Sequence, residues 1–262
     1  MRYSVAVGFF ALAINSALLA ADDAQLKKAR LSEMKAMAGH ITVEIESAGS
    51  FVAAKMVESP VLRTIDSARV LQRAEDGSLW IWTHRGLPVA IVELFAEGKS
   101  HHWGHALILT SPYKTTATRD RHVWKPKATF QFKPLAGAAM PHAKAVARRI
   151  QSRKLARRFS AHIVDGRDHQ AFRLLQEPIY RYQGEVGEDG AVYAFVRGES
   201  NPKALVLIQA RNKKWECAVV RCSANELHVD LDGKNYWMVN QAAGWTGTAE
   251  GPFLVFYEDS DR

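Results

Sequence analysis

The chain has 262 residues, of which 47% are hydrophobic and 24% are charged. These proportions are those of a globular protein and exclude an intrinsically disordered one. The length allows one large domain or two of ordinary size, and the formal net charge of +8 makes polyanions a class of partner to consider.

The N-terminus predicts an export signal. Arg2 supplies a positive charge, residues 4–19 form an apolar core, and Ala20-Ala21 offers a cleavage region. An uncleaved anchor is the alternative, because a leucine stands three positions before either alanine. Asn15-Ser16 interrupts the apolar run, which barely reaches spanning length, and this favours cleavage. We therefore expect a periplasmic or extracellular protein, with no membrane span after the leader.

The first half of the chain predicts one helix followed by strands. Residues 22–38 have apolar positions near one face, and Gly39 ends the helix. Residues 41–46 alternate as a half-buried strand does, and a second strand is expected over residues 51–63. Three strong strands follow at 78–83, 88–95 and 102–110, joined by short turns, which predicts an antiparallel meander.

The second half predicts the same order. A helix is expected over residues 141–162, closed by Gly166, with a strand over residues 170–175 and a meander from Asp189 onward. Asp232-Gly233 is a strong hairpin dipeptide and joins the strands 226–231 and 235–239. Residues 251–257 form the last predicted strand.

Three segments of the first half recur in the second half in the same order. Residues 76–82 match 189–195, residues 88–92 match 202–206, and residues 103–111 match 215–223. The predicted fold class is therefore α+β with an internal duplication, each unit being one helix plus a mainly antiparallel β-meander. The predicted divisions are a signal peptide (1–21), a first unit (22–140) and a second unit with an extra C-terminal hairpin (141–262).

The repeated strands carry apolar residues at both phases of their alternation, so both faces of each sheet need cover. A helix covers one face, and the sister unit is the simplest cover for the other, which predicts a pseudo-twofold tandem. The order of helix and meander is similar to cystatin-like and nuclear-transport-factor-like folds, a likeness that carries no function.

Several segments together resemble an uncharacterised family of exported bacterial proteins. They are Trp124-Lys125-Pro126, Phe132-Lys133-Pro134, residues 155–159, residues 177–182 and Asn201-Pro202 leading into residues 204–208. The resemblance covers most of the mature chain. It implies no known activity, so it assigns no functional residues to this sequence.

The two cysteines, Cys217 and Cys222, are predicted not to pair with each other. An odd spacing on one strand places them on opposite faces and roughly 17 Å apart, whereas a disulfide needs Cα atoms within about 7 Å. Buried free thiols are the simplest interpretation, with an intermolecular bridge or a metal site as the alternative.

Histidines are the first candidates for chemistry. His101 and His105 share a strand face, but they would lie about 13 Å apart, too far for both to bind one ion at ~2.0–2.1 Å without ligands from other strands. A structural role is therefore favoured, and we predict no metal and no cofactor. His228 and Asp230 also share a strand face and could act in general acid–base catalysis, although any strand with one wet face shows this alternation.

The predicted second helix is strongly basic. Its candidate polyanion-binding residues are Arg148, Arg149, Arg153, Lys154, Arg157 and Arg158, which would face acidic polysaccharide or lipid headgroups. The alternative is a solvated face whose arginine stems cover the edge of the core. Export argues against nucleic acid, and no recognition module for it is visible.

Five aromatic residues of the second half lie near loops or strand ends and could stack on sugars or apolar ligands: Tyr180, Tyr182, Tyr236, Trp237 and Trp245. The favoured alternative is that they cap an edge of the core. The sequence carries no nucleophile, phosphate-binding or dinucleotide motif. Our leading hypothesis is thus an exported, non-catalytic binding or interaction protein of the cell envelope. The alternatives are an enzyme using His228 with Asp230, and a polyanion-binding surface on the basic helix.

Overall fold

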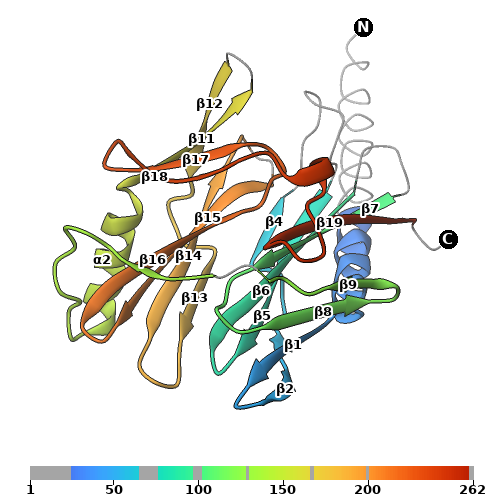
Figure 1. The fold of residues 1–262 in the computed structure, drawn as a ribbon, viewed down its shortest axis with the longest axis horizontal. Helices are drawn as coiled ribbons and strands as arrows, with labels where there is room; N and C mark the ends of the chain where they lie inside the picture. The colour runs from blue at the N-terminus through green and yellow to red at the C-terminus, as the bar shows by residue number, and fades with distance from the viewer. Residues whose placement is uncertain are drawn as a thin grey trace, which may run out of the picture.

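The computed structural model describes residues 25–64, 76–96, 102–127, 130–165, 168–198 and 201–259. The predicted α+β duplication of helix-plus-meander units is wrong. The protein is mostly β, with 53% of the described residues in strands and 14% in helices, and its largest sheet curls into a half-barrel (Figure 1). The predicted leader, residues 1–21, lies outside the described residues. No helix in the described ranges has both the length and the apolar character needed to cross a bilayer.

The described strands form three antiparallel sheets. The four-stranded sheet has the order β2 (Ser50–Ala53), β1 (Thr42–Ser47), β8 (Thr115–Arg119) and β9 (His122–Trp124). The six-stranded sheet has the order β19 (Phe253–Asp259), β7 (His102–Leu109), β6 (Leu87–Ala96), β5 (Asp76–His84) and β3 (Lys55–Met56), and β4 (Leu62–Thr64) also pairs with β5.

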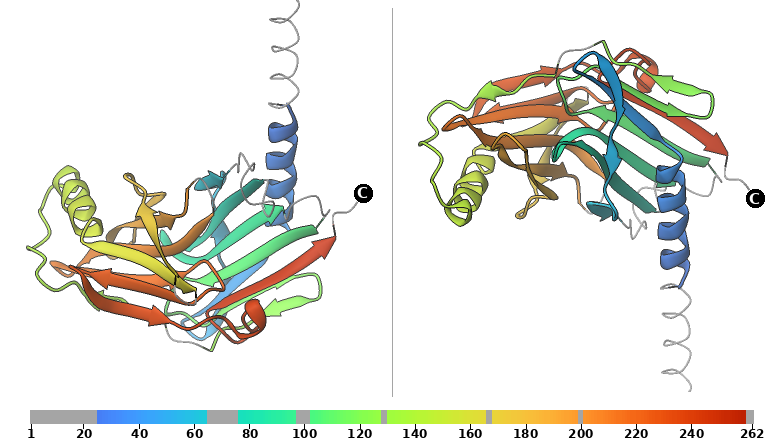
Figure 2. Two further views of the ribbon diagram at one scale, coloured as in Figure 1. Left: turned by 90° about the horizontal axis from the view of Figure 1, so that it is seen from above. Right: turned by 90° about the horizontal axis from the view of Figure 1, so that it is seen from below.

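The nine-stranded sheet contains most of the second half. Its order is β10 (Lys133–Pro134), β16 (Lys214–Arg221), β15 (Pro202–Arg211), β14 (Asp189–Val196), β12 (Asp168–Leu174), β11 (Phe159–Asp165), β17 (Leu227–Leu231) and β18 (Lys234–Val239), and β13 (Tyr180–Gln183) also pairs with β14. The helices are an N-terminal helix, described over residues 25–39, α2 (Ala145–Ala156) and the short 3₁₀-helix η1 (Ala243–Trp245). The N-terminal helix and α2 lie at opposite ends of the molecule (Figure 2).

Most individual strands were predicted correctly. β5, β6 and β7 form the expected antiparallel meander, and β17 turns into β18 where the hairpin dipeptide stands. Both residues of that turn, Asp232 and Gly233, have positive φ, as a two-residue hairpin loop requires. The single strand expected over residues 51–63 is wrong, because the chain changes sheets within it. The amide of Ala54 still bonds to Val43 of β1, but that of Val57 bonds to Ile81 of β5.

The helix predicted over residues 141–162 is also too long. α2 covers only Ala145–Ala156, and the chain enters strand β11 at Phe159. From there Phe159, Ala161 and Ile163 are buried in alternation, which is the period of a strand and not of a helix. The basic residues before them hid this change of period, because arginine and lysine favour helices.

Strands β14, β15 and β16 are apolar on both faces because they separate two cores. Val192, Leu205 and Val220 belong to a large core shared with the six-stranded sheet, the four-stranded sheet and the N-terminal helix. Their neighbours in alternation, such as Tyr193 and Val206, belong to a second core inside the curl of the nine-stranded sheet. The sequence correctly predicted that both faces of these strands are covered. On one face, however, the cover comes from the curl of the same sheet and not from a helix alone.

The curl brings the two ends of the nine-stranded sheet together. Cys217 on β16 has its Sγ 3.0 Å from the hydroxyl oxygen of Tyr236 on β18, although five strands separate β16 from β18 in the sheet order. α2 closes the second core, burying Leu155 and Ala156, and its Ser152 hydroxyl lies 2.7 Å from that of Tyr193. In the first half, the N-terminal helix and the four-stranded sheet pack against the large core.

Strand β19 joins the six-stranded sheet from far along the chain. It pairs with β7 over seven residues, from Phe253 opposite Ile108 to Asp259 opposite His102. The segment before it also bonds to the first half, since the amides of Lys125 and Lys127 donate to Ala249 and Glu250. The first and second halves of the sequence are therefore joined through backbone hydrogen bonds as well as through side chains.

The six-stranded and nine-stranded sheets meet closely at Gly86, in the β5–β6 turn. Gly86 has a φ of +79°, and a Cβ there would collide with the backbone carbonyl of Gln183 at the end of β13. Gly49, in the β1–β2 turn, has nearly the same φ of +81° but has no atom within 4 Å of that position. A substitution at Gly49 therefore measures the cost of the backbone conformation alone. A substitution at Gly86 measures that cost together with the cost of the contact.

We expect Gly49→Ala to lower the free energy of unfolding by about 1–2 kcal/mol, from left-handed strain alone. Gly86→Ala should cost this and about 1–3 kcal/mol more, because the sheets must move apart. Urea denaturation of both variants measures the difference. Equal losses would show that the β5–β6 turn can shift freely and that this contact does not fix the sheets.

Candidate ligand-binding site

The predicted catalytic pair is not assembled as expected. His228 Nε2 lies 2.8 Å from Glu226 Oε1, whereas Asp230 Oδ2 faces His162 Nδ1 at 3.7 Å. The His162 and His228 rings stack with centroids 5.0 Å apart, and burial lowers the pKa of His162 although Asp230 opposes this. These side chains lie on the face of β17 opposite the second core, and they line neither of the two cavities described below.

Of the two predicted metal candidates, the structure describes only His105. His101 lies outside the described residues. His105 is fully buried, stacks on Phe256 and has its Nε2 3.3 Å from Glu258 Oε2. Within the described ranges, no group of three or more His, Cys, Asp or Glu side chains is placed to hold a metal ion.

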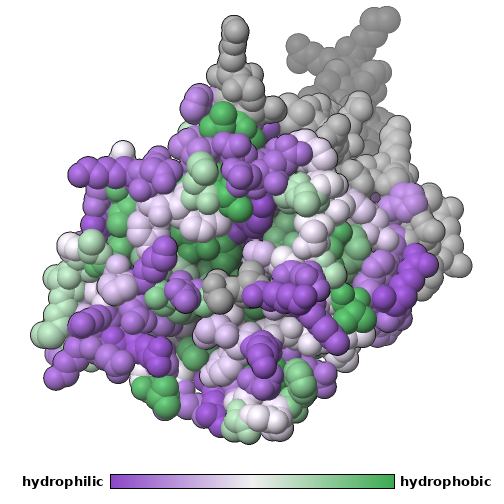
Figure 3. All heavy atoms as spheres, viewed as in Figure 1, coloured by the Kyte–Doolittle hydropathy of each residue, from purple (hydrophilic) through white to green (hydrophobic). Residues whose placement is uncertain are grey.

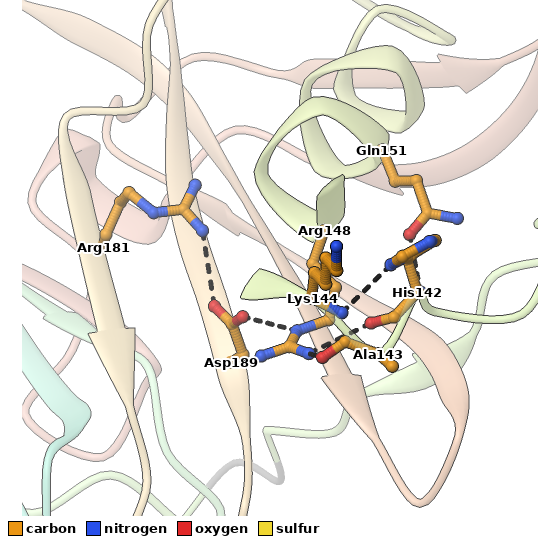
Figure 4. Close-up of polar contacts among 7 residues, drawn as sticks. All are labelled: His142, Ala143, Lys144, Arg148, Gln151, Arg181 and Asp189. Atoms are coloured by element: carbon orange, nitrogen blue, oxygen red, sulfur yellow. Dashed lines mark hydrogen bonds and ion pairs between the residues drawn. The ribbon is translucent and has the colours of Figure 1, made fainter. Parts of the chain in front are cut away.

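The basic residues around α2 divide into two sets. Arg148 points inward and donates to Asp189 Oδ2 at 2.6 Å, where Arg181 binds the other oxygen at 3.3 Å (Figure 4). The same Arg148 guanidinium donates to the carbonyls of His142 and Ala143, just before the helix. This inward arginine fastens α2 to β14 and is not available to a polyanion.

Two further candidates are paired within the protein. Arg158 forms a two-pronged contact with Asp232, and Arg153 pairs with Glu177 at 2.9 Å. The remaining candidates, Arg149, Lys154 and Arg157, are exposed and form no ion pair with the described residues. The basic helix is therefore partly structural and partly free.

Cys217 and Cys222 are both buried free thiols, as predicted, and face different cores. Cys217 lines a cavity of about 310 Å³ between β16 and β18, which we call the seam cavity. A hollow with a hydrophobic floor is visible on this face among mostly hydrophilic residues (Figure 3). Its buried polar side chains Cys217 and Arg221 are engaged, since Cys217 contacts Tyr236 and Arg221 donates to three backbone carbonyls, whereas Gln131 and Lys133 in the same lining are exposed.

A second cavity, of about 240 Å³, lies where turns of the six-stranded and nine-stranded sheets meet, and we call it the junction cavity. The β5–β6 turn, the segment after β7, the β13–β14 turn and the end of β15 form its wall. Its lining residues are Arg85, Leu87, Pro88, Val89, Thr110, Ser111, Pro112, Tyr113, Phe132, Tyr182, Glu185, Val186, Glu188, Gln209 and Arg211.

The junction cavity differs from the seam cavity in its buried polar atoms. Glu188 is only 4% exposed, and its Oε2 has no hydrogen-bond partner in the described residues. The buried hydroxyl of Thr110 has none either. The other Glu188 oxygen lies 3.5 Å from Arg211 Nε, which is longer than an ordinary hydrogen bond. A buried carboxylate oxygen without a donor is costly.

The rest of the wall is held in place by its own hydrogen bonds. The Tyr182 hydroxyl donates to Gln209 Oε1 at 3.2 Å, and Gln209 Nε2 donates to Glu216 at 3.0 Å. Burial raises the pKa of Tyr182 above its ordinary value, so this hydroxyl stays protonated. A glycine at position 190 allows the Tyr182 ring to lie against the backbone of β14. The wall therefore offers a fixed aromatic ring beside fixed polar groups.

The charges of the junction cavity balance. Two arginines and two glutamates line it, and they form two pairs. Arg85 Nε lies 3.8 Å from Glu185 Oε2, and Arg211 Nε lies 3.5 Å from Glu188 Oε1. This arrangement can bind an uncharged molecule with hydroxyl groups and a partly apolar surface. The sequence indicated Tyr182 as a possible binding aromatic but did not indicate Glu188, which looks like an ordinary polar residue of a turn, or Thr110, which looks like the polar end of a strand.

No protein-family model, curated protein or solved structure matches this chain. The resemblance to exported bacterial proteins therefore stays a prediction.

Proposed function

We propose that this chain is a non-catalytic binding protein, exported to the cell envelope, whose ligand is a small uncharged molecule rich in hydroxyl groups, such as a monosaccharide. The observation that carries the proposal is the buried Glu188 carboxylate oxygen, which lacks a donor in the wall of the junction cavity. We expect export because the sequence predicts a signal peptide over residues 1–21.

The size and chemistry of the cavity support this ligand class. Its volume of about 240 Å³ falls just below the roughly 300–1,000 Å³ of sites for drug-sized ligands, so a single small ring suits it. A sugar hydroxyl can donate to Glu188, another can pair with Thr110, and the less polar ring face can pack on Tyr113 or Phe132. The balanced charges of the wall favour an uncharged ligand over an acidic or basic one.

The test is a panel of neutral monosaccharides measured by calorimetry, with Glu188→Gln as the diagnostic variant. A hydrogen bond to a charged acceptor contributes about 1.5–3 kcal/mol, so we expect binding to weaken about 10- to 100-fold. Thr110→Val should weaken it by a smaller factor, because that hydroxyl is neutral.

Glu185→Gln is the matched control. Glu185 lies in the same turn and lines the same cavity, but its side chain is 67% exposed, so binding should change less than about threefold. The proposal is wrong if no neutral sugar binds, or if Glu188→Gln folds normally and binds as tightly as the parent protein.

A further inference from the structure

The outer face of α2 exposes large apolar side chains. Val146 is 68% exposed and Ile150 is 54% exposed, and the two are four residues apart, so they lie one turn above the other. The buried residues of α2, Ser152, Leu155 and Ala156, lie on the opposite side of the helix. The first turn has no acidic residue. Among the described residues, then, nothing covers this apolar pair.

Cations surround this pair. Arg149, Arg153 and Arg157 follow Val146 at helical spacings of three, seven and eleven residues, which places them on the same face. Arg149 and Arg157, with Lys154 beside them, are exposed and form no ion pair with the described residues. By contrast, Arg148 and Arg158 turn inward to Asp189 and Asp232. The outward cations are thus not needed to hold the helix on the sheet.

Apolar and cationic side chains together identify the partner. An acidic polysaccharide or a nucleic acid would engage the cations but would gain nothing from Val146 and Ile150. An anionic lipid surface offers both phosphates for the cations and an acyl boundary for the apolar side chains. Charge complementarity and exposed apolar area therefore point to the same partner.

We propose that the outer face of α2 docks on an anionic lipid bilayer. Val146 and Ile150 enter the boundary between headgroups and acyl chains, and Arg149, Lys154 and Arg157 bind the phosphates. This docking is independent of the ligand in the junction cavity, because none of these five residues lines that cavity.

A fluorescent label on α2 tests the docking directly. Ile150→Cys carries an environment-sensitive dye, and the buried Cys217 and Cys222 stay unlabelled in the folded protein. We expect a blue shift with vesicles of phosphatidylcholine and phosphatidylglycerol, and none with phosphatidylcholine alone. High salt should reverse the shift. The same dye at Glu44→Cys, on the exposed face of β1, should not shift.

Charge reversal tests the residues. In the labelled protein, Arg149→Glu with Arg157→Glu should weaken partitioning onto the anionic vesicles about 30-fold or more. The matched control is Lys28→Glu with Lys35→Glu, two exposed lysines of the N-terminal helix at the other end of the molecule, and it should change partitioning less than about fivefold.

The proposal is overturned if the label on α2 stays unshifted on anionic vesicles, or if the control pair weakens partitioning as much as the α2 pair. Retention on heparin that depends on Arg149 and Arg157, without any shift of the label on vesicles, would also overturn it and would favour an acidic polysaccharide. Circular dichroism of each variant confirms that the fold is kept.

Discussion

Replacing Glu93 by glutamine is expected to make the protein more stable at alkaline pH and to remove a large part of its pH dependence. Glu93 lies on β6 in the large core, 3% exposed, with one carboxylate oxygen that has no hydrogen-bond partner in the described residues. Burial raises its pKa from 4.5 to about 8, and Lys203 offsets this only in part. The folded protein therefore keeps this carboxyl protonated at neutral pH.

The sign of the effect follows from where the proton is held. Between pH 4.5 and about 8 only the folded state binds it, so the free energy of unfolding falls as the pH rises. The loss reaches up to about 5 kcal/mol, at ~1.36 kcal/mol for each pH unit. Glu93→Gln cannot ionise and should not show this loss. The adjacent thiol of Cys222 does not compete, since burial raises its pKa well above the ordinary value.

Urea denaturation between pH 5 and pH 9 measures the difference between parent and variant. Glu44→Gln is the control, because Glu44 is an exposed residue of β1, and it should alter the profile by less than about 0.5 kcal/mol. Parallel profiles for Glu93→Gln and the parent protein would mean that Glu93 is ionised in the core.

His105→Leu is expected to protect the protein against acid. His105 is fully buried on β7, and burial lowers its pKa from 6.5 to about 3, with Arg119 and His122 acting in the same direction. The nearby Glu258 does not reverse this, because its Oε2 is already bound by Arg119 Nε at 2.5 Å. The folded protein therefore holds a neutral imidazole.

Between pH 6.5 and about 3 only the unfolded state binds a proton at His105, so the protein loses stability as the pH falls. The loss amounts to up to about 5 kcal/mol, and leucine removes it while filling a similar volume. Denaturation midpoints at pH 7, 5 and 4 measure the effect, with the exposed His40→Leu as control. If the two variants have the same acid profile, His105 is protonated in the folded state.

The local signals in the sequence were sufficient for the strands but not for the architecture. Period-two alternation located β5, β6, β7, β17 and β18 because each is bounded by a turn with its own chemistry. The curled sheet depends instead on pairings such as β12 with β14 and β11 with β17, which no local pattern specifies. The helix expected over residues 141–162 took in the first four residues of β11, and without that strand the curl could not be foreseen.

The candidate site shows the same limit. Tyr182 was noticed because an aromatic residue near a loop is conspicuous, but Glu188 stands in a polar turn where a solvated acid is the ordinary interpretation. Its burial comes from the β5–β6 turn, about a hundred positions earlier in the chain, which packs across the end of β13. Only the tertiary structure brings these segments together.

The pairing of β19 with β7 has a consequence for how the chain folds. β7 ends at residue 109 and β19 begins at residue 253, so the six-stranded sheet gains its last strand only when nearly the whole chain is free to fold. Until then, the hydrophobic strand β7 has an unpaired edge that a chaperone can hold and that other unfolded chains can pair with.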